Sequence, residues 1–235
     1  MCGIVGLHLK DPSLQERLGA LLVPMLTALA PRGPDSAGIA LYSDEFPDPD
    51  GLQVYKDVGH PAAICERYKI AGISGHQGVG HTRMATESAV TTEHSHPFAP
   101  GGGLTLVHNG SFSNHATIRR RLLDQGVRFD TDNDSEVAAR YLAWRLEAGD
   151  DLGDGLRMVL KEFDGFFTLL VATPTQFAVV RDAFACKPAV IAETAGYVAM
   201  ASEYHALAGL PGIEDAEVFE PMPEEIHLWT RQVPR

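Results

Sequence analysis

The order of the predicted secondary-structure elements constrains the fold of this 235-residue chain more than any other feature. Short apolar runs and longer stretches with helical spacing of apolar residues follow one another as strand, helix, strands, helices and again strands. A parallel Rossmann-type sheet requires regular alternation of strand and helix, which this order does not provide. We therefore expect an α+β protein in which the helices are segregated outside the sheets.

The predicted strands are short and are bounded by glycine, proline and polar residues. They cover residues 4–9, 39–42, 52–58, 77–83, 104–108, 166–172, 177–181, 189–192, 197–201 and 226–229. Turn-like stretches separate the four runs between residues 166 and 201, which predicts a single antiparallel meander.

The predicted helices cover residues 14–29, 61–68, 114–124, a segment from 133 onward and 152–163. Pro24 lies inside the first of these and is expected to kink it. Asn114 and Asn133 are suited to cap the helices that follow them, and Glu136 is placed to act as the capping-box partner of Asn133.

The composition favours one large domain over residues 1–235, because 45% of the residues are hydrophobic and no linker or repeat divides the chain. A net charge of -12 at pH 7 disfavours nucleic acid as a partner, since the phosphate backbone is also negative. No window approaches the roughly 20 apolar residues that a membrane helix needs, so no membrane interaction is expected.

The sequence predicts a cytoplasmic location. The N-terminus, Met1–Gly6, has no basic region followed by a long apolar run and so does not resemble a signal peptide. The cysteines are Cys2, Cys65 and Cys186, an odd and sparse set that fits neither a disulfide framework nor a zinc or iron–sulfur pattern.

Cys2 is the first candidate for chemistry. Removal of Met1 would leave a free α-amine with a pKa of about 7.7–8.0 beside a thiol with a pKa of about 8.5. The amine could then take the thiol proton, directly or through a water, so that one residue supplies nucleophile and base. Taken alone, a cysteine near the chain start is more often a buried small hydrophobe.

Two arginine-containing segments form the next candidates. Arg32–Gly38 reads as a tight turn with a surface ion pair, because Gly33 and Pro34 follow the arginine. Gly80–Thr86 ends an apolar strand with a guanidinium, at Arg83, and a hydroxyl, at Thr86. A guanidinium can hold a carboxylate through two parallel hydrogen bonds, but a structural salt bridge is the alternative.

Two further segments carry amides and carboxylates. Asn109 and Gly110 follow a strand, where an amide and a backbone N–H could form an oxyanion hole or simply a hairpin turn. Asp134 lies at a predicted helix start, where its carboxylate could hold an ammonium group or cap the helix. His94, His96 and His108 raise the question of a metal, but their spacing supplies no diagnostic third ligand, so neither a metal nor another cofactor is expected.

Together these segments supply a nucleophile with its base, an oxyanion hole, a carboxylate clamp and an ammonium acceptor. A free amino acid with a reactive side-chain carbonyl would use all of them, and L-glutamine is that substrate. In this order along the chain, the segments resemble those of class II glutamine amidotransferases, members of the N-terminal nucleophile hydrolase superfamily. The matching segments are Met1–Gly6, Arg32–Gly38, Gly80–Thr86, Val107–Gly110, Asp134–Glu136, Arg181-Asp182 with Lys187-Pro188, and Ala201–Glu203.

The resemblance implies a four-layer αββα sandwich of two antiparallel sheets between helical layers. It implies that Cys2 attacks the glutamine carboxamide and that the thioester is hydrolysed. It further implies the following roles: Asn109 and Gly110 in the oxyanion hole, Arg83 with Thr86 at the substrate α-carboxylate, Asp134 at the α-ammonium, and Arg32 in a turn close to the nucleophile.

Two stretches, residues 82–92 and 181–188, resemble the separate amidotransferase subunits of glutamate-synthase-like and N-methylglutamate-synthase-like systems. The ammonia would then pass to a separate synthase subunit, and a homo-oligomer is compatible with the sequence. One alternative is a non-catalytic, glutamine-sensing regulatory subunit, which the presence of Cys2, Asn109 and Asp134 disfavours. A second is an acylase-type N-terminal nucleophile amidase, which Arg83 and Asp134 disfavour because they would recognise both ends of an amino acid.

Overall fold

The fold is given by a computed structural model that describes residues 2–84 and 90–232. Its strands are β1 (Gly3–Leu9), β2 (Ser36–Tyr42), β3 (Leu52–Val58), β4 (Gln77–Arg83), β5 (Phe98–Gly101), β6 (Leu104–Phe112), β7 (Gly165–Ala172), β8 (Gln176–Arg181), β9 (Val190–Glu193), β10 (Tyr197–Ala201), β11 (Glu217–Phe219) and β12 (Ile226–Thr230). Its α-helices are α1 (Leu18–Ala28), α2 (Pro61–Arg67), α3 (His115–Asp124), α4 (Asp134–Glu147) and α5 (Leu152–Glu162). Short 3-10 helices are η1 (Pro12–Arg17), η2 (Ala30–Arg32), η3 (Ile70–Gly72), η4 (Tyr204–Ala206) and η5 (Ile213–Asp215).

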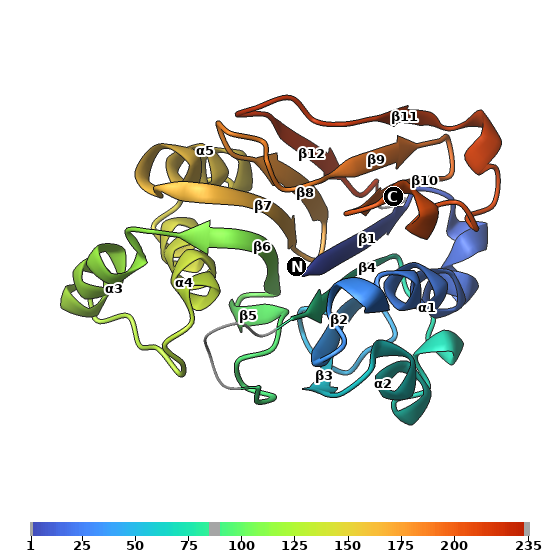
Figure 1. Cartoon of the computed structure of the whole chain (residues 1–235), viewed down its shortest axis with the longest axis horizontal. Coiled ribbons are helices and arrows are strands. Elements are labelled where there is room, and N and C mark those ends of the chain that lie inside the picture. Colours follow the sequence, from blue (N-terminus) through green and yellow to red (C-terminus); the bar gives the residue numbers. More distant parts are fainter. Residues whose placement is uncertain (1, 85–89, 233–235) are drawn as a thin grey trace.

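The described strands form two sheets that lie face to face (Figure 1). One has seven strands in the order β11-β9-β10-β1-β4-β2-β3, and the other has five in the order β12-β8-β7-β6-β5. Neighbouring strands are antiparallel throughout both sheets. Helices α1 and α2 cover the outer face of the larger sheet, and α4 and α5 cover that of the smaller one. The predicted four-layer αββα sandwich is confirmed.

Alternation of side chains along the strands fills three apolar layers. In β1, Val5 and Leu7 point towards α1, whereas Ile4 packs between the sheets. The sheets approach closely at Gly6, where an added Cβ would lie only 2.5 Å from Cδ2 of Leu170. The core between the sheets is therefore thin along β1, and β1 packs closely against β6 and β7 of the other sheet.

A buried tyrosine joins the two sheets at the end remote from Cys2. The Tyr42 hydroxyl lies 2.8 Å from the Gly103 carbonyl, 2.9 Å from the Ala172 carbonyl and 2.7 Å from Oγ1 of Thr105. Because a buried phenol needs hydrogen-bond partners, these contacts fix the position of β2 against β6 and β7 of the other sheet.

The predicted meander over residues 166–201 is wrong. The hairpin of β7 and β8 belongs to the smaller sheet, whereas β9 and β10 pair in the larger one. The connection between β8 and β9 crosses from one sheet to the other. The Asp182 carboxylate accepts hydrogen bonds from the N–H groups of Phe184 and Ala185, and Ala185 has a positive φ of 49°. This local turn redirects the chain, and the apolar pattern of the strands gives no sign of it.

Several element boundaries also differ from the prediction. The helical stretch at residues 14–29 is divided into η1 and α1, because the Asp11 side chain caps a 3-10 turn that starts at Pro12. Asn114 precedes α3, but its side chain bonds Glu162 and Asp164 and makes no cap hydrogen bond. The short strands β5 and β11 were not predicted, since β5 contains proline and glycine and β11 has three residues.

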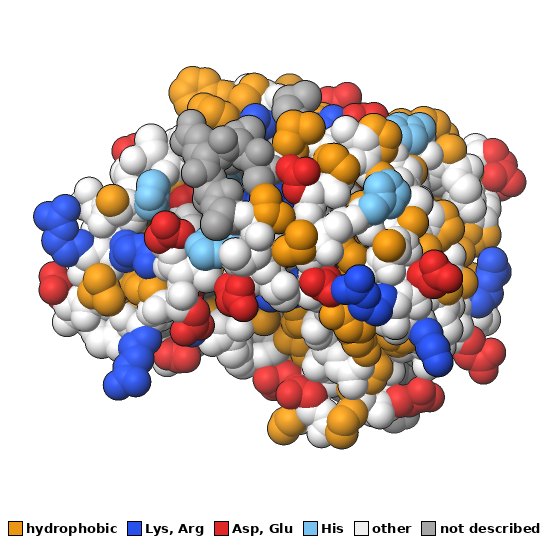
Figure 2. All heavy atoms as spheres, turned by 60° about the horizontal axis from the view of Figure 1, so that its bottom comes forward, with side chains coloured by type: hydrophobic (Ala, Val, Ile, Leu, Met, Phe, Trp, Pro, Cys, Tyr) orange, Lys and Arg blue, Asp and Glu red, His pale blue; other side chains and the backbone are white. Residues whose placement is uncertain are grey.

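The surface of the described residues carries charges of both signs. On the face shown in Figure 2, acidic and basic side chains are interspersed with apolar ones. Within the described residues, no helix combines the length and the apolar character needed to cross a bilayer.

Candidate active site

Cys2 directly precedes β1, which is anchored on both sides. Gly3 pairs with Thr82 of β4, and Ile4 N–H donates to Oγ of Ser202 at 3.0 Å. Ser202 N–H in turn donates to the Ile4 carbonyl at 2.9 Å. Cys2 itself remains partly exposed. A cysteine at the end of a fixed strand, with access to solvent, meets the geometric requirement for a nucleophile.

Arg32 holds the backbone at Cys2. Its Nε–H donates to the Cys2 carbonyl at 3.0 Å, and the guanidinium forms an ion pair with Glu203. The turn that carries Arg32 packs tightly on β4, because a Cβ at Gly33 would lie 2.5 Å from the carbonyl carbon of Thr82. The predicted turn arginine is thus in direct contact with the candidate nucleophile through the backbone.

Arg83 ends β4 and is buried. It is opposite Ser36 of β2, and its carbonyl accepts a hydrogen bond from Asp35 N–H at 3.1 Å. Since Gly3 pairs with Thr82, Arg83 lies beside Cys2 at the same end of the sheet. The predicted neighbour Thr86 lies outside the described residues.

Asn109 and Gly110 lie inside β6, not in a hairpin turn. They pair with Thr168 and Phe167 of β7. The Asn109 side chain is buried, and its Nδ2 has no hydrogen-bond partner among the described residues. Gly110 has φ of +148°, and an added Cβ would lie 2.1 Å from the Phe166 carbonyl oxygen. The position therefore requires glycine, and the Nδ2 group of Asn109 is available to an oxyanion.

A histidine contact brings β4 and β6 together at this end. Nε2 of His81 lies 3.1 Å from the His108 carbonyl and must donate to it. Burial lowers the pKa of His81 to about 3, so the ring is neutral at pH 7. The His96 ring centroid lies 4.0 Å from that of His81, and burial also lowers its pKa well below the usual value. Neutral, packed imidazoles thus link the strand of Arg83 to the strand of Asn109.

Asp134 is the first residue of α4. Its Oδ2 accepts a hydrogen bond from Phe112 N–H at 3.0 Å, and its Oδ1 accepts one from the Ser135 hydroxyl at 3.2 Å. The helix is capped instead by Asn133, whose side chain accepts from Ser135 N–H at 2.8 Å. Asp134 is therefore directed at the end of β6, two residues beyond Gly110, and is not the capping group.

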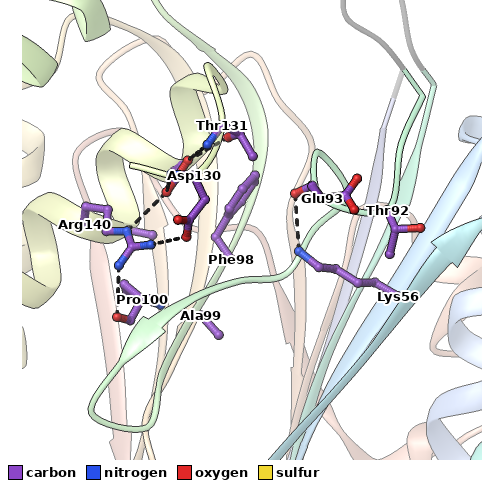
Figure 3. Close-up of a pocket in the computed structure, with 11 residues that line it drawn as sticks. Lys56, Thr92, Glu93, Phe98, Ala99, Pro100, Asp130, Thr131 and Arg140 are labelled. Atoms are coloured by element: carbon purple, nitrogen blue, oxygen red, sulfur yellow. Dashed lines mark hydrogen bonds and ion pairs between the residues drawn. The ribbon is translucent and has the colours of Figure 1, made fainter. Parts of the chain in front are cut away.

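Glu136 ties the loop before α4 to the helix. Figure 3 shows Asp130 and Thr131 of this loop beside Arg140 of the helix. The Glu136 carboxylate accepts hydrogen bonds from the N–H groups of Asp130, at 2.8 Å, and Thr131, at 2.7 Å, and Nε of Arg140 donates to it at 3.2 Å. Burial alone would raise the pKa of Glu136, but these hydrogen bonds lower it overall. The predicted capping-box bond from Asn133 N–H to Glu136 is wrong, since that N–H donates to Oγ1 of Thr131.

The histidines considered as metal ligands have other contacts. His94 lies 2.9 Å from Asp132 and 2.8 Å from Oγ1 of Thr91, whereas His96 and His108 lie in the buried cluster described above. Within the described residues, no three His, Cys, Asp or Glu side chains are grouped as a metal site requires.

Three contacts at the site were not predicted from sequence: Ser202 at Ile4, Glu203 at Arg32, and Ser135 at Asp134. Only the resemblance of Ala201–Glu203 to a family segment pointed to the first two. Ser202 and Ile4 are 198 residues apart and Glu203 and Arg32 are 171 apart, so no local pattern indicates these two contacts.

Comparison with known proteins gives consistent similarities. A family model described as a glutamine amidotransferase domain matches residues 81–209. The chain is 41% identical to the glutamine amidotransferase-like protein GlxB of Rhizobium meliloti, over 99% of both chains. It is 32% identical to the isomerizing glutamine–fructose-6-phosphate aminotransferase of Pseudomonas aeruginosa, with 99% of this chain covering 37% of that protein. The structure of B. subtilis glutamine phosphoribosylpyrophosphate amidotransferase, complexed with ADP and GMP, matches with a TM-score of 0.79 and 25% identity, over 97% of this chain and 47% of that one.

Proposed function

Because this chain belongs to the class II glutamine amidotransferases, enzymes with an N-terminal cysteine nucleophile, we propose that Cys2 hydrolyses L-glutamine to glutamate and ammonia. The observation that carries this assignment is the position of Asn109. Its buried Nδ2, which has no hydrogen-bond partner in the described part of the chain, lies on β6, and a His81–His108 contact joins β6 to the strand beside Cys2. The proposal requires removal of Met1, which leaves the α-amine of Cys2 as the base.

In the proposed reaction, the thiol proton passes to the α-amine while Sγ forms a bond to the carboxamide carbon. The Asn109 amide and Gly110 N–H stabilise the resulting oxyanion. The carbon–nitrogen bond then breaks, and ammonia leaves with the proton returned by the ammonium. Water attacks the thioester, releases glutamate and restores the thiol. Arg83 binds the α-carboxylate and Asp134 binds the α-ammonium.

We further propose that residues 1–235 act as one cytoplasmic amidotransferase domain that delivers ammonia to a separate synthase subunit of a glutamate-synthase-like system. The single domain is supported by the Rhizobium meliloti relative, 99% of which is matched by this chain. The glutamate-synthase-like system is proposed from the resemblance of residues 82–92 and 181–188. Adding the synthase subunit should increase glutamine turnover, and equal rates with and without it would contradict this part of the proposal.

The test of the nucleophile is the intact mass of the protein before and after reaction with 6-diazo-5-oxo-L-norleucine, an electrophilic glutamine analogue. We expect loss of Met1 and a single adduct that peptide mapping places on Cys2. The Cys2→Ala variant should take none. Cys65 provides an internal comparison, because burial raises its thiol pKa to about 11. The Cys186→Ser variant controls for reaction at the exposed thiol.

A retained Met1 in protein made by its own host would contradict the mechanism. Absence of the adduct in a correctly processed chain would instead favour the non-catalytic regulatory subunit.

A further inference from the structure

A buried histidine adjoins the predicted ammonium-binding carboxylate. His108 immediately precedes Asn109 on β6, and its Nδ1 lies 2.8 Å from Oγ of Ser135. The Ser135 hydroxyl lies 3.2 Å from Oδ1 of Asp134. A continuous line of side chains therefore connects the strand of the oxyanion residues to the start of α4.

The Asp134 carboxylate sets the direction of the hydrogen bonds between His108, Ser135 and Asp134. An ionised carboxylate can only accept, so the Ser135 hydroxyl donates its proton to Asp134. The oxygen of Ser135 must then accept from Nδ1–H of His108, which assigns the tautomer with a bare Nε2. Burial lowers the pKa of His108, although the Asp134 carboxylate opposes this effect, so the ring remains neutral at pH 7.

The ring is held by packing as well as by the hydrogen bond. His108 stacks on Phe112 with ring centroids 4.3 Å apart and an interplanar angle of 22°. The His108 and Phe167 rings are arranged edge to face, with centroids 6.5 Å apart. Its Nε2 is directed towards Gly110, where an added Cβ would lie 3.0 Å away. The imidazole is therefore a rigid donor, and only its Nδ1–H reaches Ser135.

We propose that His108 is a positioning residue that acts through Ser135 to fix the Asp134 carboxylate for the α-ammonium of glutamine. This inference rests on the proposed function. Phe112 N–H holds Oδ2 of Asp134, and the His108–Ser135 line holds Oδ1, so the rotation of the carboxylate is set from both oxygens. The Asp134 side chain keeps 24% of its surface exposed, which leaves lone pairs open to a ligand.

One strand thereby fixes both ends of the substrate. The backbone after His108 carries Asn109 and Gly110 for the carboxamide, and the His108 side chain orders the acceptor for the ammonium. Loss of the hydrogen bonds that run from His108 through Ser135 to Asp134 should weaken recognition of the α-ammonium and leave the reaction at Cys2 intact.

The experiment compares labelling of Cys2 by 6-diazo-5-oxo-L-norleucine and by 6-diazo-5-oxohexanoate, which lacks the α-amine. The labelling kinetics give a half-saturation constant and a maximal rate for each probe. We expect Ser135→Ala and His108→Leu to raise the half-saturation constant for the amino probe about tenfold, with the maximal rate within about twofold. The constant for the probe without the amine should stay unchanged.

Conservative variants provide the matched comparison. Ser135→Thr keeps the hydroxyl, and the amide of His108→Asn can place an N–H where Nδ1 stood, so both should restore most of the affinity for the amino probe. Equal weakening towards both probes, or a fall in maximal rate alone, would overturn the inference while leaving the proposed function in place. Absence of Cys2 labelling in the unmodified protein would instead contradict the proposed function and the inference with it. Ser135→Ala removes one hydroxyl and serves as the test if His108→Leu does not fold.

Discussion

The Nε–H of Arg32 donates to the Cys2 carbonyl at 3.0 Å, across 30 residues of sequence. The same guanidinium pairs with Glu203, which follows β10 on the other side of β1. The Cys2 carbonyl is thus held by Arg32, whose guanidinium also reaches the segment that follows β10.

Arg32→Lys should therefore slow the reaction at Cys2 even though it retains the charge. A lysine ammonium lacks the planar fork that serves two partners in fixed directions. We expect the maximal rate of Cys2 labelling to fall about tenfold, with little change in half-saturation. Glu203→Gln is the control, because the glutamine amide oxygen can still accept from the Arg32 guanidinium, so the rate should stay within about twofold of the unmodified one. An unchanged rate in Arg32→Lys would contradict this role.

Asn109→Ala should lower the rate of glutamine hydrolysis. Removal of one oxyanion-hole donor typically costs about 10²–10³ in kcat, because the donor acts where charge develops in the transition state. The KM for glutamine should change by no more than a few fold. Asn114→Ala is a matched control, since the Asn114 side chain hydrogen-bonds the backbone of Glu162 and Asp164 and the residue directly precedes α3. A variant that loses affinity but keeps kcat would assign Asn109 to ground-state binding.

Gly110→Ala should reduce both stability and activity. The new Cβ would lie 2.1 Å from the Phe166 carbonyl oxygen and 2.7 Å from Cα of Phe167, so β6 must move away from β7. Gly126→Ala is the control, because Gly126 also has positive φ, of 84°, but has no atom within 4 Å of an added Cβ among the described residues. The free energy of unfolding of Gly126→Ala should fall only by the strain of a left-handed alanine, about 1–2 kcal/mol. Urea unfolding should show a larger loss for Gly110→Ala, and equal losses would contradict the clash.

The sequence predicted local features well where turn residues mark the ends of an element. The bounds of β3 and β4 agree with those predicted, since Gly51 and Gly59 flank β3 and Gly75 lies just before β4. Sheet membership could not be predicted in the same way. The apolar runs of β9 and β10 are compatible with either sheet, and the turn at Asp182 decides between them.

In the candidate site, too, the residues could be predicted from the sequence but the contacts that orient them could not. Cys2, Arg83 and Asp134 stand in recognisable segments, and the structure brings their strands and helix to one end of the sheets. The hydrogen bonds that orient them depend on tertiary contacts of single side chains. Ser135 was expected only as part of a helix start, and its contact with His108 depends on how α4 packs on β6.

The buried imidazoles predict a loss of stability as the pH falls below neutrality. Burial lowers the pKa of His81 to about 3, whereas the unfolded value is about 6.5. Below pH 6.5 the unfolded chain therefore binds a proton that the folded chain excludes, and the free energy of unfolding decreases. Between pH 6.5 and 5 the decrease from His81 is about 1.6 kcal/mol, because the unfolded imidazole is only half protonated at pH 6.5 and the slope approaches about 1.36 kcal/mol per pH unit only at lower pH. His96 acts in the same direction, because its pKa is also lowered by burial.

Urea unfolding of the unmodified chain and of His81→Gln at several pH values checks this expectation. Glutamine can place an N–H where Nε2 of His81 donates to the His108 carbonyl, so the variant keeps that bond but cannot titrate. The free energy of unfolding should fall by about 1.6 kcal/mol less in the variant between pH 6.5 and 5. Above about pH 7.5, where the unfolded imidazole is almost fully deprotonated, the difference between the two proteins should be constant. Glu136, whose pKa is lowered below 4.5, contributes its loss of stability at more acidic pH and does not disturb this window. Parallel curves from pH 6.5 to 5 would show that His81 is protonated in the folded protein and would contradict its burial as a neutral ring.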